Sequence, residues 1–135
     1  MLENNLINIH YKLYFETMWN VEFTEEFAEW WHSLSETEQV SVDASVRLLE
    51  NLGPNLSRPY VDTIKGSKHS NMKELRSQSG GNPLRTLFVF DPRRSAILLV
   101  GGDKTGDNRF YERMVPAADR IYTNYLNELR QEGLI

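Results

Sequence analysis

One segment, residues 73–115, predicts three short strands with a basic residue near the end of each, followed by the start of a helix. The three basic residues are Arg76, Arg85 and Lys104. Because antiparallel strands lie side by side, sequential hairpins would gather these cations on one surface. A phosphate backbone requires a surface of this kind. The segment therefore predicts an antiparallel sheet with one phosphate-binding face.

Two helices are predicted before this segment. Residues 19–23 alternate between apolar and polar and predict a half-buried strand. Thr24 is placed to cap the first helix, and Ser35 with Glu38 forms the pattern of a capping box for the second. Gly53 then ends the second helix. Because the break between the two helices is only one or two residues long, they are expected to form an antiparallel helical hairpin.

After the helical hairpin, the sequence predicts several short strands joined by turns, and then a final helix. The predicted order of strands and helices indicates an α+β domain, with a mostly antiparallel sheet and helices packed on it. Pro116 predicts a break or kink in the last helix. The predicted elements are a partly extended segment 59–64, a polar loop 65–71, strands 72–77, 84–90 and 96–100, turns 79–82 and 91–94, a loop 101–106, and a final helix capped by Asp107 or Asn108.

The chain of 135 residues is long enough for one domain, which we place at residues 18–135. Residues 1–17 match this pattern poorly and are expected to be an extension, either disordered or adding an edge strand from about Ile7 to Phe15. The absence of cysteine excludes disulfides, cysteine-ligated metals and a thiol nucleophile, and fits a cytoplasmic protein. The sequence has no run of about 18 apolar residues, so no membrane span is expected. Its first residues lack the basic start and apolar middle of a secretory signal, so none is expected.

The charge is unevenly distributed. The net charge is −4, yet residues 58–109 contain ten Lys or Arg against five Asp or Glu. The rest of the chain is acidic, mostly in the predicted helices. A basic strand region backed by acidic helices can dock on RNA through one face. The alternative is that the acidic helices are simply solvated and the strand charges are incidental.

The order and identity of these elements resemble the RelE/ParE superfamily of bacterial type II toxins, in particular the HigB-type branch, also called the phage Gp49-like family. The resemblance covers about residues 18–130. It rests on residues 18–31, Leu52-Gly53-Pro54, Lys73-Glu74-Leu75-Arg76, residues 84–91 (LRTLFVFD), residues 98–104 and residues 107–118.

The resemblance implies a RelE-like fold: an N-terminal strand and helical hairpin on a sheet of four to five strands, plus a C-terminal helix. It also implies a toxin that cleaves mRNA in the ribosomal A site without a metal or other cofactor, by attack of the ribose 2′-hydroxyl on the adjacent phosphate. The implied partners are the ribosome, mRNA and a cognate antitoxin of helix-turn-helix type, in a homodimer or a toxin–antitoxin hetero-oligomer. Two alternatives remain open. One is a ParE-like protein that inhibits DNA gyrase without catalysis, and the other is a degenerate phage-derived toxin acting only in a repressor complex.

Five residues are the predicted catalytic set. Arg85 and Arg76 are expected to stabilise transition-state charge or contact phosphate, and Lys104 to neutralise phosphate or donate a proton. Relatives often have a second basic residue where this chain has Thr105. Tyr111 would stack on a base or take part in proton transfer, and His69 would act as an acid–base group.

Each of these assignments has a structural alternative. Arg76 can pair with Glu74 or Asp91, Arg85 can form a cross-strand pair, Tyr111 can be a packed aromatic, and His69 can be solvated. The three histidines lack the spacing of a metal site. The predicted RNA-binding residues are Lys65, Lys68, Lys73 and Arg109.

Overall fold

A computed structural model describes residues 18–135, which fold around one five-stranded sheet. The strand order is β1-β5-β4-β3-β2, with β1 parallel to β5 and the other neighbours antiparallel. The predicted α+β class and mostly antiparallel sheet are confirmed. The extension predicted for residues 1–17 lies outside the described residues. The strands are β1 (Val21–Phe23), β2 (Val61–Thr63), β3 (Lys73–Ser79), β4 (Asn82–Phe90) and β5 (Ala96–Asp103).

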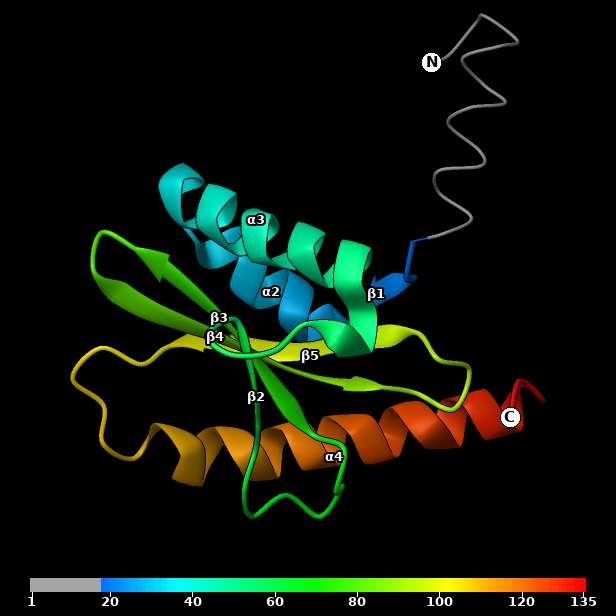
Figure 1. The fold of residues 1–135 in the computed structure, drawn as a ribbon. Coiled ribbons are helices and arrows are strands. Elements are labelled where there is room, and N and C mark those ends of the chain that lie inside the picture. Colours follow the sequence, from blue (N-terminus) through cyan, green and yellow to red (C-terminus); the bar gives the residue numbers. More distant parts are fainter. Residues whose placement is uncertain (1–17) are drawn as a thin grey trace, which may run out of the picture.

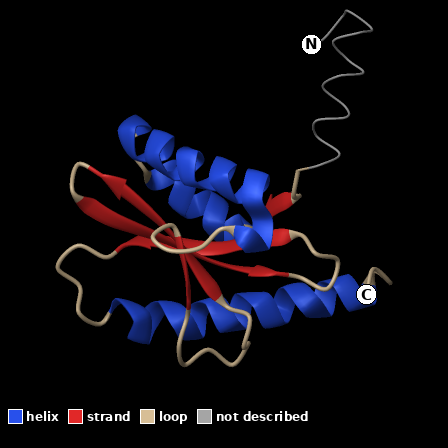
Figure 2. Cartoon of the chain, viewed as in Figure 1, coloured by secondary structure: helices blue, strands red, loops and turns tan. Residues whose placement is uncertain are grey.

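Helices cover both faces of the sheet (Figures 1 and 2). Helices α2 (Glu25–Ser33) and α3 (Glu36–Leu52) lie side by side over one face, and α4 (Phe110–Gln131) spans the other. Each face therefore has its own hydrophobic core. Consecutive strand residues point to opposite faces, so Leu87 packs in the core under α4 and Phe88 in the core under α2 and α3.

The predicted caps of the helical hairpin are confirmed. The Thr24 hydroxyl accepts a backbone N–H from the first turn of α2 at 3.1 Å. Ser35 and Glu38 form the reciprocal capping box of α3, with distances of 3.2 and 2.9 Å. Gly53 follows α3 with φ +53°, and the Trp19 ring occupies the space that its Cβ would need. These local signals fix the ends of both helices, and a short 3-10 turn, η1 (Gly53–Asn55), leads away from them.

Strand β5 is longer than predicted, because it runs through both glycines to Asp103 instead of ending at Val100. Its partner β4 continues the ladder over this stretch, pairing Thr86 with Gly101. Glycine is also required for the packing here. A Cβ on Gly101 would lie 2.1 Å from the ring of Trp30 in α2, and one on Gly102 would lie 2.8 Å from a side chain of α4.

Substitution of Gly101 by alanine is expected to destabilise the fold by about 1–3 kcal/mol, the usual cost of overpacking a well-packed site. The Trp30 ring must move away from the new methyl group. Chemical denaturation would measure the loss of stability. The double variant Gly101→Ala, Trp30→Ala is the control, since the clash predicts that the two costs are not additive. Additive costs would show that the ring and the glycine do not compete for space.

Helix α4 differs from its prediction at two points. Neither Asp107 nor Asn108 is the N-cap, because the helix begins after Arg109, which has no side-chain cap. The predicted break at Pro116 is wrong, since α4 continues through it to Gln131. Apolar side chains on both sides of the proline pack against the sheet and hold the helix together. Within residues 18–135 no helix is long and apolar enough to cross a bilayer.

Candidate active site

A buried carboxylate, Glu74 on β3, lies at the centre of the predicted site. Its side chain is only 5% exposed. One oxygen lies 3.2 Å from Nη2 of Arg76, and the other lies 3.5 Å from Nε of Arg85. The Tyr111 hydroxyl, from the first turn of α4, donates to that second oxygen at 2.6 Å. The fold thus joins three of the five predicted catalytic residues through one acidic side chain.

The sheet register explains why this carboxylate is needed. Arg76 and Arg85 are direct cross-strand partners. Two like charges directly opposite each other are unfavourable in an antiparallel pair. Glu74 offsets that repulsion by contacting both guanidinium groups. From the sequence, Glu74 was only an alternative partner for Arg76. Its position two residues before Arg76, on the same face of the strand, was the available signal for its larger role.

The ion pairs continue outward from Arg76. Its Nη2 also lies 3.2 Å from Asp62 of β2, and Asp62 in turn lies 3.1 Å from Arg58. The hydrogen bond from Arg58, helped by a backbone N–H, lowers the pKa of the Asp62 carboxyl. A line of alternating charges therefore runs from the buried Glu74 to Arg58, whose side chain is 77% exposed.

Lys104 lies on the other side of this cluster. Its backbone N–H donates to the Pro83 carbonyl at 2.9 Å, and its Nζ lies 5.1 Å from the centre of the Tyr111 ring. The adjacent Thr105 bonds to the Asp103 carboxylate through its hydroxyl at 2.6 Å. Position 105 therefore contributes no second cation, and Lys104 supplies the positive charge of this loop, over the aromatic ring.

Burial first, and then the hydrogen bond to Glu74, raises the pKa of the Tyr111 phenol above its ordinary value of 10. Tyr111 is therefore protonated at neutral pH and serves as a hydrogen-bond donor. This favours a positioning or stacking role for Tyr111 over the role of general base.

An alkaline titration should show these buried phenols directly. Burial also raises the pKa of Tyr122, and that of Tyr125 to about 12. When folding raises the pKa of a phenol, its neutral form contributes to the stability of the fold. This contribution is complete below pH 10, the ordinary pKa, and is lost as the pH rises through the pKa of the folded state. Tyrosinate absorbance should therefore show a late step near pH 12 that disappears in Tyr125→Phe. A step that persists in this variant would contradict the assignment.

His69 is not part of the cluster. Its Nε2 lies 3.0 Å from Oγ1 of Thr123, and its ring packs edge-on against Tyr122. Thr123 is twelve residues beyond Tyr111 in α4, about 18 Å along the helix axis. The fold therefore separates His69 from the predicted catalytic set.

The four predicted RNA-binding residues are also spread out. Lys65 and Lys68 are exposed on a loop whose backbone and Ser67 hydroxyl bond to Asp119, in the middle of α4. Lys73 is on β3 but, by alternation, points to the face opposite Glu74. Arg109 is exposed at the start of α4. Of these four, Arg109 alone lies beside Tyr111 in the chain.

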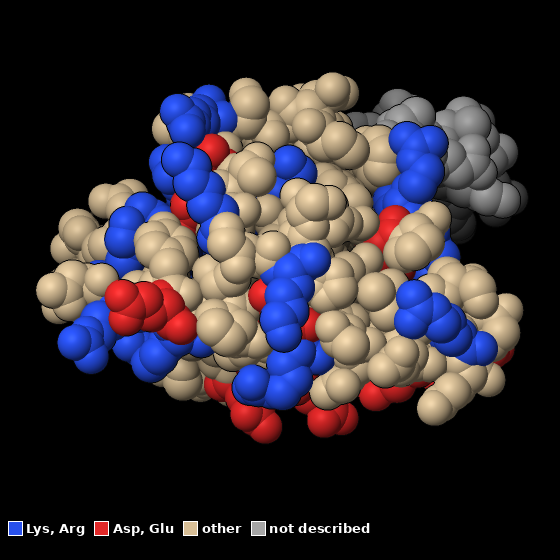
Figure 3. Space-filling model, turned by 90° about the horizontal axis from the view of Figure 1, so that it is seen from below, with Lys and Arg blue, Asp and Glu red and all other residues tan. Residues whose placement is uncertain are grey.

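The basic side chains on the surface do not form one continuous patch. Figure 3 views the molecule from the α4 side and shows basic side chains in separate groups, with acidic side chains among them. Several groups gather at the end that holds the β3–β4 turn and the start of α4, on the left in Figures 1 and 3. The basic surface is therefore concentrated at one end of the molecule and does not extend across the whole face.

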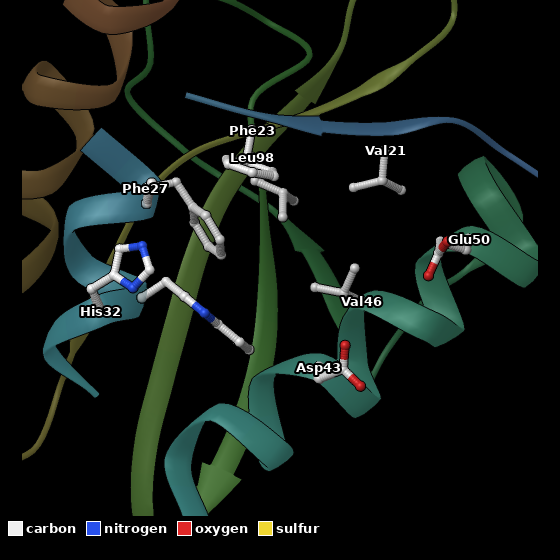
Figure 4. A pocket seen from close by; sticks show the side chains of 10 residues that line it. Val21, Phe23, Phe27, His32, Asp43, Val46, Glu50 and Leu98 are labelled. Atoms are coloured by element: carbon white, nitrogen blue, oxygen red, sulfur yellow. The ribbon is translucent and has the colours of Figure 1, made fainter. Parts of the chain in front are cut away.

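Two surface hollows differ in chemistry. One, of about 350 Å³, lies among β1, α2 and α3 and is lined largely by apolar side chains such as Phe27 and Val46 (Figure 4). Its carboxylates are Asp43 and Glu50, and none of its lining residues in the described chain is Lys or Arg. This hollow is therefore unsuited to phosphate. A second hollow, of about 580 Å³, contains both arginines of the cluster.

Comparison with known proteins places this geometry in context. Residues 29–123 match the model of the family described as phage-derived protein Gp49-like. Two Mycobacterium tuberculosis proteins, each named as a toxin, are also similar. HigB3 is 46% identical over 98 residues, covering 72% of this chain and 84% of HigB3. HigB2 is 41% identical over 104 residues, covering 76% of this chain and about half (52%) of HigB2.

A structural comparison supports the fold. The E. coli toxin RelE, solved as an arginine-substituted variant in its free state, superposes with a TM-score of 0.51 at 10% sequence identity. The match covers 72% of this chain and 95% of that structure. It confirms the predicted RelE-like fold.

Proposed function

Because the Gp49-like family model matches most of this chain, the chain belongs to that phage-derived family, and we propose that it is an mRNA-cleaving toxin of a toxin–antitoxin module. The toxin assignment is supported by the similarity to HigB3 and HigB2. One observation carries the proposal of cleavage: Glu74 holds Arg76, Arg85 and Tyr111 together at one end of the sheet.

The arginine pair is suited to stabilising a pentacoordinate phosphate. In the proposed reaction the ribose 2′-oxygen bonds to phosphorus, and the bond from phosphorus to the 5′-oxygen breaks. Negative charge grows on the non-bridging oxygens in between, where Arg85 and Arg76 would donate hydrogen bonds. Arg76 uses Nη2 for both neighbouring carboxylates, and its Nε is buried without a hydrogen-bond partner, so Nη1 is the donor left for phosphate.

Proton transfers complete the proposed reaction. The 2′-hydroxyl proton passes to water, and the Lys104 ammonium gives a proton to the departing 5′-oxygen. The products are a 2′,3′-cyclic phosphate and a 5′-hydroxyl. Tyr111 would orient Glu74 and Lys104, since it touches both. The proposed cleavage uses the side-chain cations Arg76, Arg85 and Lys104. Within residues 18–135, no group of three or more His, Asp or Glu could hold a metal ion.

The proposal includes two macromolecular partners. A cognate antitoxin, expected to be of helix-turn-helix type, would hold the toxin inactive. The toxin names of the relatives support an antitoxin partner. The ribosome would present mRNA in its A site.

The rival function is gyrase inhibition without catalysis, on the same kind of fold. The acidic net charge and the absence of a cation at Thr105 favour this rival. The two functions can be separated with the purified protein. In a translating extract the nuclease proposal predicts new mRNA ends carrying 5′-hydroxyls, with gyrase supercoiling unaffected. Intact mRNA together with blocked supercoiling would favour the gyrase inhibitor.

A further inference from the structure

The second hollow, of about 580 Å³, lies beside the arginine cluster at an open edge of the sheet. Strand β2 pairs with β3 only as far as Leu75, so β3 has no strand partner on that side beyond this point. Helix α3 and the Pro59–Tyr60 segment form the other walls, and Arg76 and Arg85 also line the hollow. The volume falls within the range of about 300–1,000 Å³ that is usual for small-ligand pockets.

The wall contains groups that suit a nucleobase. The Tyr60 side chain is large, aromatic and 46% exposed, although α3 and β3 are close by. Exposed aromatic rings are the usual stacking platforms for unpaired RNA bases. The Gln78 amide and the Ser41 hydroxyl also line the hollow, and each can both donate and accept a hydrogen bond.

Tyr60 is fixed relative to the cationic cluster. Its carbonyl accepts the backbone N–H of Arg76 at 2.8 Å. Two residues later, Asp62 bonds to the Arg76 guanidinium. A phosphate held by Arg76 would therefore place the neighbouring base next to the Tyr60 ring.

We propose that this hollow is a nucleobase subsite, in which Tyr60 stacks on a base of single-stranded RNA adjacent to the phosphate held by Arg76 and Arg85. The inference rests on the proposed function and adds a recognition element to it. Neither Tyr60 nor Gln78 contacts the reacting phosphate in this arrangement. Tyr60 provides affinity, and Gln78 reads the edge of the base.

The test compares Tyr60→Ala and Tyr60→Phe with the unchanged protein. Fluorescence anisotropy would measure binding of a short single-stranded RNA with 2′-O-methyl groups, which cannot be cleaved by the proposed route. Loss of one stacked base predicts a dissociation constant about tenfold higher for Tyr60→Ala and little change for Tyr60→Phe. Phe23→Ala is the matched control, because Phe23 is 65% exposed and lines the apolar hollow on the opposite side of the hairpin.

Gln78→Ala supplies a second readout. It should reduce the difference in affinity among RNAs that vary at one base, without the general loss seen for Tyr60→Ala. Equal RNA affinities for Tyr60→Ala and the unchanged protein would overturn the subsite, and so would an absence of RNA binding by the unchanged protein. Weaker antitoxin binding with unaltered RNA affinity would also overturn it. The proposed cleavage is judged separately, by the mRNA ends formed in the translating extract.

Discussion

Replacement of Arg85 by alanine is expected to slow mRNA cleavage by about 10²–10³-fold, the usual cost of removing one donor to a developing oxyanion. Arg85 is the best placed of the cations, since its side chain is only 12% exposed and its Nε lies 3.5 Å from Glu74. Single-turnover cleavage of ribosome-bound mRNA would measure the rate. Arg85→Lys should recover part of it, because lysine restores the charge without the planar fork of donors.

Arg109→Ala is the matched control for this loss. Arg109 precedes α4, is exposed and lies outside the Glu74 cluster, whereas Arg85 is on β4. Because the predicted role of Arg109 is RNA contact and not catalysis, its removal should change mRNA binding more than the single-turnover rate. Thermal unfolding of each variant would separate loss of catalysis from loss of folding. Cleavage by folded Arg85→Ala within a few-fold of the unchanged protein would show that Arg85 is a structural cross-strand partner only.

Replacement of Glu74 by glutamine is expected to have the largest effect on stability, about 3 kcal/mol. This value is near the low end of the usual cost of breaking a buried ion pair, because solvent can still stabilise the charge of the partly exposed Arg76. The amide keeps the shape but removes the charge between two opposed guanidinium groups. Denaturant unfolding would give the free energy. Cleavage should fall as well, because the amide offers one acceptor oxygen and no charge to Arg76, Arg85 and Tyr111, which share both carboxylate oxygens of Glu74.

Asp62→Asn is the control for Glu74→Gln. Asp62 also pairs with Arg76, but its side chain is 23% exposed and its other partner, Arg58, is mostly in solvent. Loss of such a solvent-screened pair should cost much less than loss of the buried charge. If Glu74→Gln were as stable as Asp62→Asn, the two arginines would not depend on the buried charge.

Local signals predicted most of the fold. Thr24, Ser35 and Glu38 set the helix ends through hydrogen bonds within one turn, so the sequence alone contains that information. The end of β5 was missed because glycine has a low strand propensity, and the reason to keep the strand lies in Trp30, about 70 residues away in the chain. The break expected at Pro116 does not occur, because packing on the sheet outweighs the intrinsic preference of proline.

In the site too, features set by local sequence were predicted, and features set by distant residues were missed. Antiparallel pairing was enough to predict that Arg76, Arg85 and Lys104 gather on one surface, whereas the direct pairing of Arg76 with Arg85 depends on the strand register. The separation of His69 could not be predicted, because it depends on how its loop bonds to the middle of α4. Tyr60 was likewise not among the predicted site residues, since its hydrogen-bonded neighbour Arg76 lies sixteen residues further along the chain, in β3.

Primer extension on mRNA from a translating extract is the most direct test of the central claim. Codon-phased cuts are expected with the unchanged protein, and their loss is expected in the folded double variant Arg85→Ala, Lys104→Ala. Cuts that persist at the same codons in the double variant would show that the cationic cluster does not catalyse cleavage. Intact mRNA with the unchanged protein would contradict the nuclease function itself.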